Sequence, residues 1–234
     1  AGHASVSWVL PHAHPLVKVT IVPRGKALGA AWYLPEERQI TTFEQLFDEM
    51  TSLLAGRAAE DVIFGKVSTG ALNDLERVTK QAYASITYFG LNEKIGNVSY
   101  FDSSPSQEYS FNKPYSEKTA ELIDKEVSEL VEKAYQRAKD IIIENKSKVI
   151  ELADILLKTE VIFREDVEAI FGKRAGDALK EEEDKKQVEA NNIAGKIEND
   201  ILTSKTINES DNNNVAENLE QNNKVEDNID NSEQ

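Results

Sequence analysis

STGALNDL, at residues 68–75, places an acidic side chain, Asp74, in the first turn of a predicted helix. From Leu72 onward the apolar residues recur at steps of three and four, which is typical of an amphipathic helix. The chain opens with Ala1-Gly2-His3, which has the form of the second half of a His-Glu-x-x-His sequence. These two stretches, far apart in the sequence, decide how the rest of the chain is interpreted.

A helical His-Glu-x-x-His sequence holds two imidazoles one turn apart on one face, where both can bind a single zinc ion. The glutamate beside them is placed to take a proton from the water that the zinc binds. If His3 is the second histidine, the first lies four residues earlier and the glutamate three residues earlier, both before Ala1. Taken alone, a histidine near the start of a chain is more often an ordinary, partly exposed residue than a ligand.

Length and cysteine content limit the possibilities further. The 234 residues are enough for one large domain or two small ones. The chain has no cysteine, so disulfides and thiolate metal sites are excluded, and any metal must use His, Asp or Glu. No apolar run approaches the roughly 20 residues of a membrane-spanning helix. We therefore expect a soluble fragment whose membrane anchor, if there is one, precedes it.

The formal net charge of −15 is unevenly distributed. Residues 1–172 hold 19 basic and 26 acidic side chains, a net charge of −7, whereas residues 173–234 hold 8 and 16, a net charge of −8. Such acidity argues against a nucleic-acid partner, because phosphate binding needs clustered Lys and Arg. The second segment has no aromatic residue and cannot bury enough apolar surface to offset the entropy cost of ordering. We expect an ordered domain over residues 1–172 and a disordered acidic tail over residues 173–234.

Apolar periodicity predicts a mainly helical (α+β) domain, bundle-like, with a small β-hairpin beside the helix of His3. The first strand, residues 16–22, is expected to place Val17, Val19 and Ile21 on its buried face. Helix starts are expected from a capping box at Thr41-Thr42-Phe43-Glu44 and from caps at Thr69 and Ser116. The second strand is expected at residues 28–34, and the helices at residues 1–10, 43–63, 72–89, 117–145, 149–158 and 164–171.

The order of seven short blocks resembles the peptidase domain of the FtsH family, the membrane-anchored AAA zinc proteases. The blocks are AGHA at 1–4, PLVKVTIVPRG at 15–25, LG at 28–29, YLPE at 33–36, GRAAE at 56–60, FG at 64–65, and TGA with NDL at 69–75. FGLNEK at 89–94 and KPYS at 113–116 are most similar to the m-AAA-like branch. The resemblance covers the chain from Ala1 to about Arg174.

This resemblance implies a set of site residues. His3 and Asp74 are implied as two of the zinc ligands, with Asp74 on a helix separate from that of the histidines. Glu60 is implied to lie near the metal and to orient a ligand histidine. The strand with Val19 and Ile21 is implied to hold unfolded substrate by accepting it as a further strand. Without the resemblance, Asp74 is a surface residue that complements a helix dipole, Glu60 a solvated carboxylate and the hairpin a plain cover.

Other metal-ligand sets are weaker. His12 and His14 form a His-x-His pair, but two prolines bracket their loop and such a loop seldom fixes both rings. A nearby glutamate as third ligand would be Glu36 or Glu37, but this segment matches a family turn instead. The extended zincin pattern would need Gly and His at positions 6 and 9, where the chain has valine.

For the complete protein, the resemblance implies an ATP-dependent zinc metalloendopeptidase that degrades unfolded membrane and soluble proteins in quality control. An upstream ATPase module would use ATP and Mg, an N-terminal anchor would hold the protein in a membrane, and six subunits, identical or mixed, would form a chamber. The location would be a bacterial inner membrane, with the peptidase on its cytoplasmic side, or a mitochondrial inner membrane with the peptidase facing the matrix. The acidic, Asn-rich tail favours the bacterial alternative.

A different class of function stays open at this point. A non-catalytic assembly module, or a degenerate subunit of an AAA protease ring, would also explain the helical stripes and the acidic surface. An assembly module does not explain why the NDL block accompanies Ala1-Gly2-His3. The residues before Ala1 would distinguish these alternatives, since a complete His-Glu-x-x-His helix is needed for catalysis.

Overall fold

The computed structural model describes residues 1–23, 29–35, 40–101, 114–182, 184–186, 188–189 and 191. The chain divides into two units, Ala1–Leu179 and Lys180–Gln234. In the second unit, the described residues are helical. The labelled elements of the first unit are α1 (Gly2–Val9), β1 (Leu16–Thr20), β2 (Ala30–Tyr33), α2 (Phe43–Phe64), the 3₁₀ helix η1 (Thr69–Ala71), α3 (Leu72–Thr87), α4 (Glu117–Glu144), α5 (Lys146–Thr159), β3 (Val161–Phe163) and α6 (Arg164–Phe171). Residues 175–179, at the end of this unit, are also helical.

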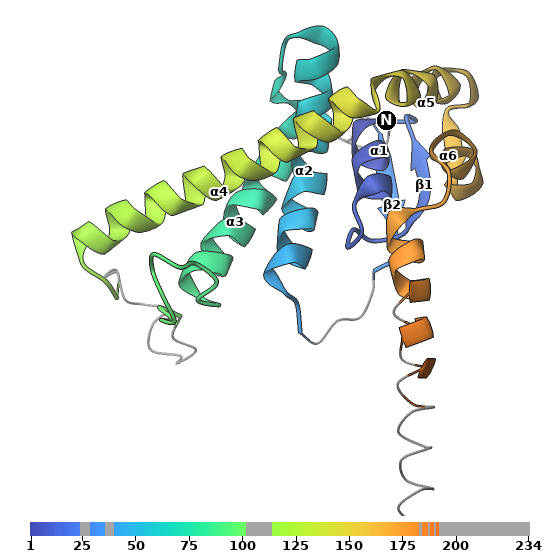
Figure 1. Cartoon of the computed structure of the whole chain (residues 1–234). Helices are drawn as coiled ribbons and strands as arrows, with labels where there is room; N and C mark the ends of the chain where they lie inside the picture. Colours follow the sequence, from blue (N-terminus) through green and yellow to red (C-terminus); the bar gives the residue numbers. More distant parts are fainter. Residues whose placement is uncertain are drawn as a thin grey trace, which may run out of the picture. The chain divides into compact units, whose positions relative to one another are not determined.

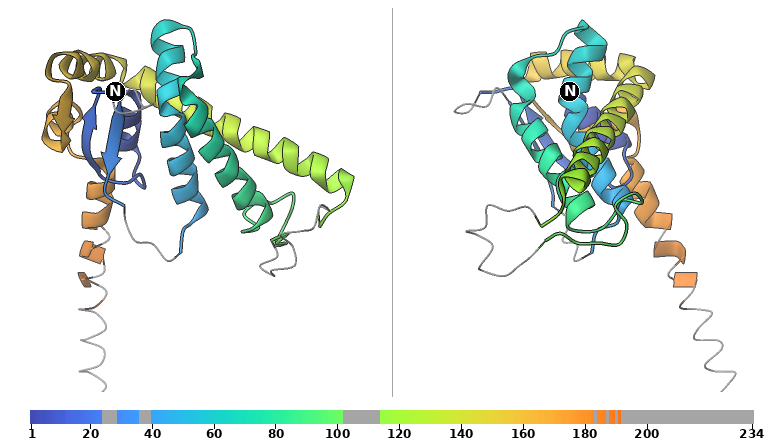
Figure 2. Two further views of the ribbon diagram at one scale, coloured as in Figure 1. Left: turned by 180° about the vertical axis from the view of Figure 1, so that it is seen from behind. Right: turned by 90° about the vertical axis from the view of Figure 1, so that its left-hand side faces the viewer.

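The mainly helical fold with a small sheet is confirmed. Helix α2 is central: α1, β1 and β2 lie to one side of it, and α3 and α4 pack on the other (Figure 1). The left view of Figure 2 shows the same order from behind. Among the described residues, no helix has both the length and the apolar character that crossing a membrane requires.

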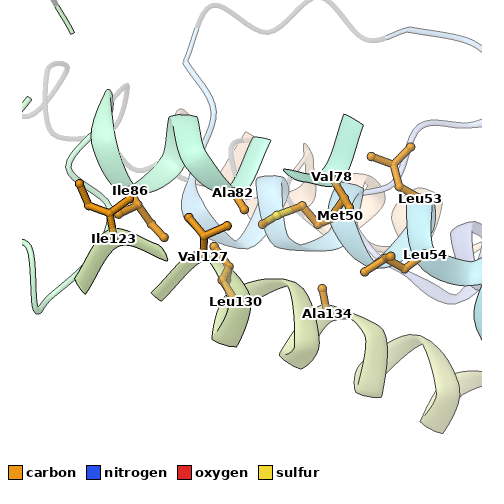
Figure 3. Close-up of a cluster of buried hydrophobic side chains, with 10 residues drawn as sticks. All are labelled: Met50, Leu53, Leu54, Val78, Ala82, Ile86, Ile123, Val127, Leu130 and Ala134. Carbon is orange, nitrogen blue, oxygen red and sulfur yellow. The ribbon is translucent and has the colours of Figure 1, made fainter. Parts of the chain in front are cut away.

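The main core lies where α2, α3 and α4 meet. Figure 3 shows their apolar side chains pointing toward one another from all three helices. The steps of three and four seen in the sequence place these residues on one face of each helix. The buried set is Met50, Leu53, Leu54, Val78, Ala82, Ile86, Ile123, Val127, Leu130 and Ala134. Because Ala82 and Ala134 are both fully buried, the helix backbones can lie close together.

A three-stranded antiparallel sheet has the strand order β2-β1-β3. It contributes to a second core, whose buried residues are Ala4, Trp8, Leu16, Val19, Leu152, Leu156, Ile162 and Val167. The third strand was not expected from the sequence, because only three residues, Val161–Phe163, form it. The expected alternation in the first strand is wrong at Val17, which is 44% exposed, whereas Leu16 and Val19 are buried. The register shifts between Leu16 and Lys18. Such a shift breaks the strict two-residue alternation on which the expectation rested.

Two helix caps differ from the sequence prediction by one residue. The capping box of α2 is formed by Thr42 and Gln45, one position after the expected Thr41 and Glu44. The turn before α3 is capped by Ser68, whose side chain accepts a hydrogen bond from the N–H of Gly70, and not by Thr69. The cap of α4 by Ser116 is confirmed.

The compact unit continues past the boundary expected at residue 172. Arg174 is 2% exposed and its Nη1 donates to the carbonyl of Ala13, while Nε and Nη2 donate to Asp177. The indole N–H of Trp8 donates to the carbonyl of Gly172. The loss of aromatic residues therefore marks the end of the apolar core but not the end of the packed structure, which continues through a buried arginine.

Some sequence predictions fall outside the described residues. These are the last two residues of the PLVKVTIVPRG block, the start of the second strand at residue 28, Glu36 and Glu37, residues 102–113 between the helices expected at 72–89 and 117–145, and the tail from residue 192 onward. The expected disorder of that tail stays a prediction.

Candidate metal centre

His3 lies on α1, where this helix crosses α2 closely. The approach depends on Gly2, because a Cβ at that position would lie 2.6 Å from the Cβ of Ala59 and 2.7 Å from the carbonyl oxygen of Ala55. The Nδ1 atom of His3 lies 3.0 Å from the carbonyl oxygen of Ser52 on α2. A carbonyl can only accept, so Nδ1 carries the hydrogen and Nε2 keeps its lone pair. A metal-binding histidine needs this tautomer when Nε2 is the ligand atom.

Asp74 stands in the first turn of α3 and faces that lone pair. Its Oδ2 atom lies 3.5 Å from Nε2 of His3. Two ligands about 2.0–2.2 Å from one zinc ion, at a tetrahedral angle, are about 3.3–3.6 Å apart. The separation therefore fits a shared metal and is longer than a good hydrogen bond. Both side chains are partly exposed, which leaves a path for an ion and a substrate.

Gly56 on α2 provides the space for the imidazole. A Cβ at this position would lie 2.4 Å from Nε2 of His3. Any other residue here would push the ring away from Ser52 or cover the lone pair that faces Asp74. From the sequence, the small residues around Gly56 were explained only by helix packing, so the contact with His3 was missed.

Glu60 bonds to Ser68, in the turn that precedes α3. One of its oxygens accepts from the backbone N–H of Ser68 at 2.8 Å and the other from the Ser68 hydroxyl at 2.8 Å. Glu60 thereby fixes the turn that leads into α3 and Asp74, and the carbonyl of Ser52 orients His3. Glu60 and His3 line one apolar cavity of about 300 Å³. Contact with another ligand histidine stays a prediction.

Tyr33, at the end of β2, is a neighbour of the pair that the sequence did not indicate. Its hydroxyl oxygen lies 3.3 Å from Oγ of Ser7, and Ser7 donates its single hydroxyl hydrogen to the carbonyl oxygen of His3 at 2.7 Å. Burial raises the pKa of Tyr33 above its ordinary value, and the charge of Asp74 raises it further, against the opposite effect of hydrogen bonds from Ser7 and Ser52. The phenol therefore keeps its proton at neutral pH.

The His-x-His loop lies beside a second cavity. His12, His14, Tyr33 and Ser52 are among the residues that line this open pocket of about 230 Å³. Within the described part of the chain, no three His, Asp or Glu side chains come together as a complete metal site requires. His3 and Asp74 are thus a pair that needs a further ligand.

Val19 and Ile21 do not lie at a free edge in this structure, and their expected role in holding substrate stays a prediction. Strand β1 is central: Val19 pairs with Ala31 on one side and Ile162 on the other. The N–H of Ile21 donates to the carbonyl of Glu160. Because β3 covers the side that the two-stranded hairpin would have left open, the edge strands among the described strands are β2 and β3.

Comparison with known proteins agrees with this geometry. Residues 1–170 match the family described as Peptidase family M41. An ATP-dependent zinc metalloprotease FtsH of Parabacteroides distasonis is 65% identical over 175 residues, which are 75% of this chain and 25% of that protein. The mitochondrial ATP-dependent zinc metalloprotease FTSH 3 of Arabidopsis thaliana is 51% identical over 177 residues, 74% of this chain and 21% of that protein.

A mouse relative is the mitochondrial inner membrane m-AAA protease component AFG3L2. It is 47% identical over 174 residues, which are 74% of this chain and 22% of that protein. The chain thus spans about a quarter of the length of these curated relatives. Since the family match covers most of the chain and includes His3 and Asp74, the chain belongs to peptidase family M41.

Proposed function

We propose that this chain is the peptidase part of an ATP-dependent zinc endopeptidase, with His3 and Asp74 as two of the three protein ligands. One observation carries the proposal: Nε2 of His3 and Oδ2 of Asp74 converge at 3.5 Å while Nδ1 is held by the carbonyl of Ser52. An assembly module needs no such pairing of a fixed imidazole with a carboxylate from another helix. The third ligand and the general-base glutamate would precede Ala1.

When bound, zinc would supply Lewis-acid chemistry, lowering the pKa of a coordinated water and polarising the scissile carbonyl. The residues of this chain prepare the site for it. Ser52 fixes the tautomer of His3, Glu60 and Ser68 hold the turn before α3, and Asp74 adds a negative charge to the ligand set. Each contact orients a donor before the ion arrives, which favours tight binding.

Substrate would bind in an extended conformation along the open edge of β2. Added strands are recognised mainly through backbone hydrogen bonds, with side-chain pockets giving selectivity. Tyr33 ends this strand beside the pocket of about 230 Å³. Recognition through backbone groups would give broad sequence tolerance, as expected for an enzyme that degrades unfolded proteins.

The remaining functions belong to the complete protein. Relatives are named ATP-dependent zinc metalloproteases and components of a mitochondrial inner membrane protease. We extend these properties to this protein: an ATPase module that uses ATP and Mg, a hexameric ring of identical or mixed subunits, and a membrane anchor. The peptidase would face the bacterial cytoplasm, or the matrix in mitochondria.

Replacing Asp74 by Asn in the full-length protein tests the proposal. Asparagine keeps the size of the side chain and removes its charge, so zinc per subunit and proteolysis of casein should both fall greatly. Glu76→Gln is the matched control, because Glu76 is an exposed carboxylate on the same helix, paired with Lys80. Zinc is measured by atomic absorption after dialysis, and folding by thermal unfolding.

The control should keep zinc and activity at the wild-type level. If Asp74→Asn does so as well, Asp74 is not a ligand. The 234-residue chain alone, with two of the expected donors, should bind zinc weakly and leave casein intact. Chelator-sensitive cleavage by this chain would contradict the ligand set.

A further inference from the structure

Arg77 on α3 carries a guanidinium that the fold hardly uses. Its Nη2 atom lies 3.8 Å from Oε1 of Glu49 on α2, which is longer than a hydrogen bond, and 61% of the side chain is exposed. Among the residues that the structure describes, none accepts a hydrogen bond from this guanidinium. An exposed ion pair of this length adds little to stability, so the donors of Arg77 are free for a ligand.

The ion pair between Arg77 and Glu49 is the next contact to the metal pair along α2 and α3, two helices that run antiparallel (Figure 1). On α2, Glu49 precedes Ser52 by three residues, and the carbonyl of Ser52 holds His3. On α3, Arg77 follows Asp74 by three residues, and Asp74 faces the same histidine. Residues three apart are neighbours on a helix face, with Cβ atoms about 5–6 Å apart. Arg77 thus begins one helical turn from the metal pair, and its long side chain can span that distance.

The guanidinium borders the open pocket of about 230 Å³, which Ser52 and Tyr33 also line. His3 and Asp74 do not line this pocket, so it lies beside the metal pair and not over it. Tyr33 is the last residue of the edge strand β2, and the charge of Asp74 contributes to raising its pKa, so the end of β2 is near that carboxylate. The pocket therefore connects the end of β2 with Arg77, next to the metal pair.

We propose that Arg77 is a substrate-binding residue whose guanidinium donates hydrogen bonds to backbone carbonyl oxygens of the substrate, close to the scissile bond. This inference rests on the proposed function. A substrate that follows β2 enters the pocket at Tyr33 and meets the metal pair one turn from Arg77. The guanidinium has five N–H donors in a planar fork and stays charged at all working pH values, so it donates without changing its protonation state.

Glu49 favours a backbone carbonyl over an acidic side chain as the partner of Arg77. A substrate carboxylate that reached this guanidinium would also lie near the carboxylate of Glu49 and would be repelled by it. A neutral carbonyl oxygen accepts from Arg77 without that cost, and Glu49 can stay where it is. Every substrate residue has such a carbonyl, which agrees with the broad sequence tolerance of the proposed function.

The test is Arg77→Met in the full-length protein, which keeps an unbranched apolar stem and removes every donor. With an uncharged fluorogenic peptide, KM should rise by on the order of 10–100-fold, as for the loss of hydrogen bonds from a charged group, with little change in kcat. Arg77→Lys keeps the charge but not the planar fork, so it should recover part of the loss. Zinc per subunit and the unfolding midpoint should stay at the wild-type level in both variants.

Two further variants exclude indirect effects. Lys80→Met removes an exposed cation of the same helix that pairs with Glu76 and does not line the pocket, so it should leave KM unchanged. Glu49→Gln removes the partner of Arg77 but leaves the guanidinium in place, so KM should not rise. If Arg77 acted only by joining α3 to α2, Glu49→Gln would show the same loss as Arg77→Met.

A pair of peptides that differ only in Glu or Gln beside the scissile bond identifies the group that Arg77 binds. Arg77→Met should raise KM for both peptides by the same factor, because their backbones are identical. A loss confined to the peptide with Glu would overturn the assignment to the backbone.

Three other results would overturn the inference while the proposed function stands: wild-type KM in Arg77→Met, a loss of zinc that accounts for its lower activity, or an equal loss in Glu49→Gln. A wild-type protein that holds no zinc and shows no chelator-sensitive cleavage would overturn the proposed function, and this role of Arg77 with it.

Discussion

Gly56 determines how closely α2 can approach the imidazole of His3. The position is in the middle of a 22-residue helix, where glycine is less favourable than alanine by about 0.5–1 kcal/mol. The contact that a side chain would make explains this choice, since its Cβ would lie 2.4 Å from Nε2. Glycine makes this part of α2 less stable, but it leaves the space that the imidazole of His3 occupies.

Gly56→Ala should therefore separate metal binding from folding. The added methyl group displaces the ring of His3, so zinc affinity of the full-length protein should fall by about 10–100-fold, as for other changes beside a metal ligand. Without zinc, the Gly56→Ala protein should be no easier to unfold than the wild type, because alanine is more favourable than glycine inside a helix. Competition with a chromophoric chelator measures the affinity.

Arg57→Ala, on the next residue of the same helix, serves as the control and should leave zinc affinity unchanged. If Gly56→Ala binds zinc as tightly as the wild type, metal binding does not depend on the space that Gly56 leaves for the imidazole of His3.

At the scale of elements, the segment after α6 holds the loop that joins α1 to β1. Arg174 donates to the carbonyl of Ala13, and Asp177 accepts from both Arg174 and Arg164. Trp8 on α1 donates to the carbonyl of Gly172. The helix that carries His3 is thus fixed at its C-terminal end by residues that follow the 1–170 family match.

Arg174→Ala should lower the free energy of unfolding by about 1.5–3 kcal/mol, because it removes charge-assisted hydrogen bonds and leaves a buried carbonyl without its donor. Urea unfolding of the 234-residue chain, followed by tryptophan fluorescence, measures this change. Lys158→Ala, at an exposed position in the last turn of α5, should shift the value by no more than about 0.5 kcal/mol. Equal stability of the two variants would show that residues beyond Gly172 do not belong to the packed unit.

At the scale of the whole molecule, the sequence predicted the elements that periodicity determines. The long apolar stripes specify α2, α3 and α4, and the expected range of α6 is the observed one. Periodicity failed in β1, where a register shift changes which side chains are buried, and for β3, which is too short to show a pattern. Composition did not indicate that Arg174 is buried, because the domain boundary was predicted from the loss of apolar and aromatic residues and arginine is neither.

The site was less accessible to sequence reasoning than the fold. His3 and Asp74 are 71 positions apart, and only block order relates them before a structure is seen. Ser52 acts through its backbone carbonyl, which every residue type has, so its identity gives no signal. Tyr33 entered the sequence interpretation only as part of the YLPE block, because its contact with Ser7 joins two elements that the sequence pattern does not relate.

The most direct measurement is the position of the metal in the full-length protein, by anomalous diffraction at the zinc edge. The account predicts one strong peak per subunit, about 2.0–2.2 Å from both Nε2 of His3 and Oδ2 of Asp74, with a further protein ligand from the residues before Ala1. A peak beside His12 and His14, or no peak within bonding distance of Asp74, would contradict it.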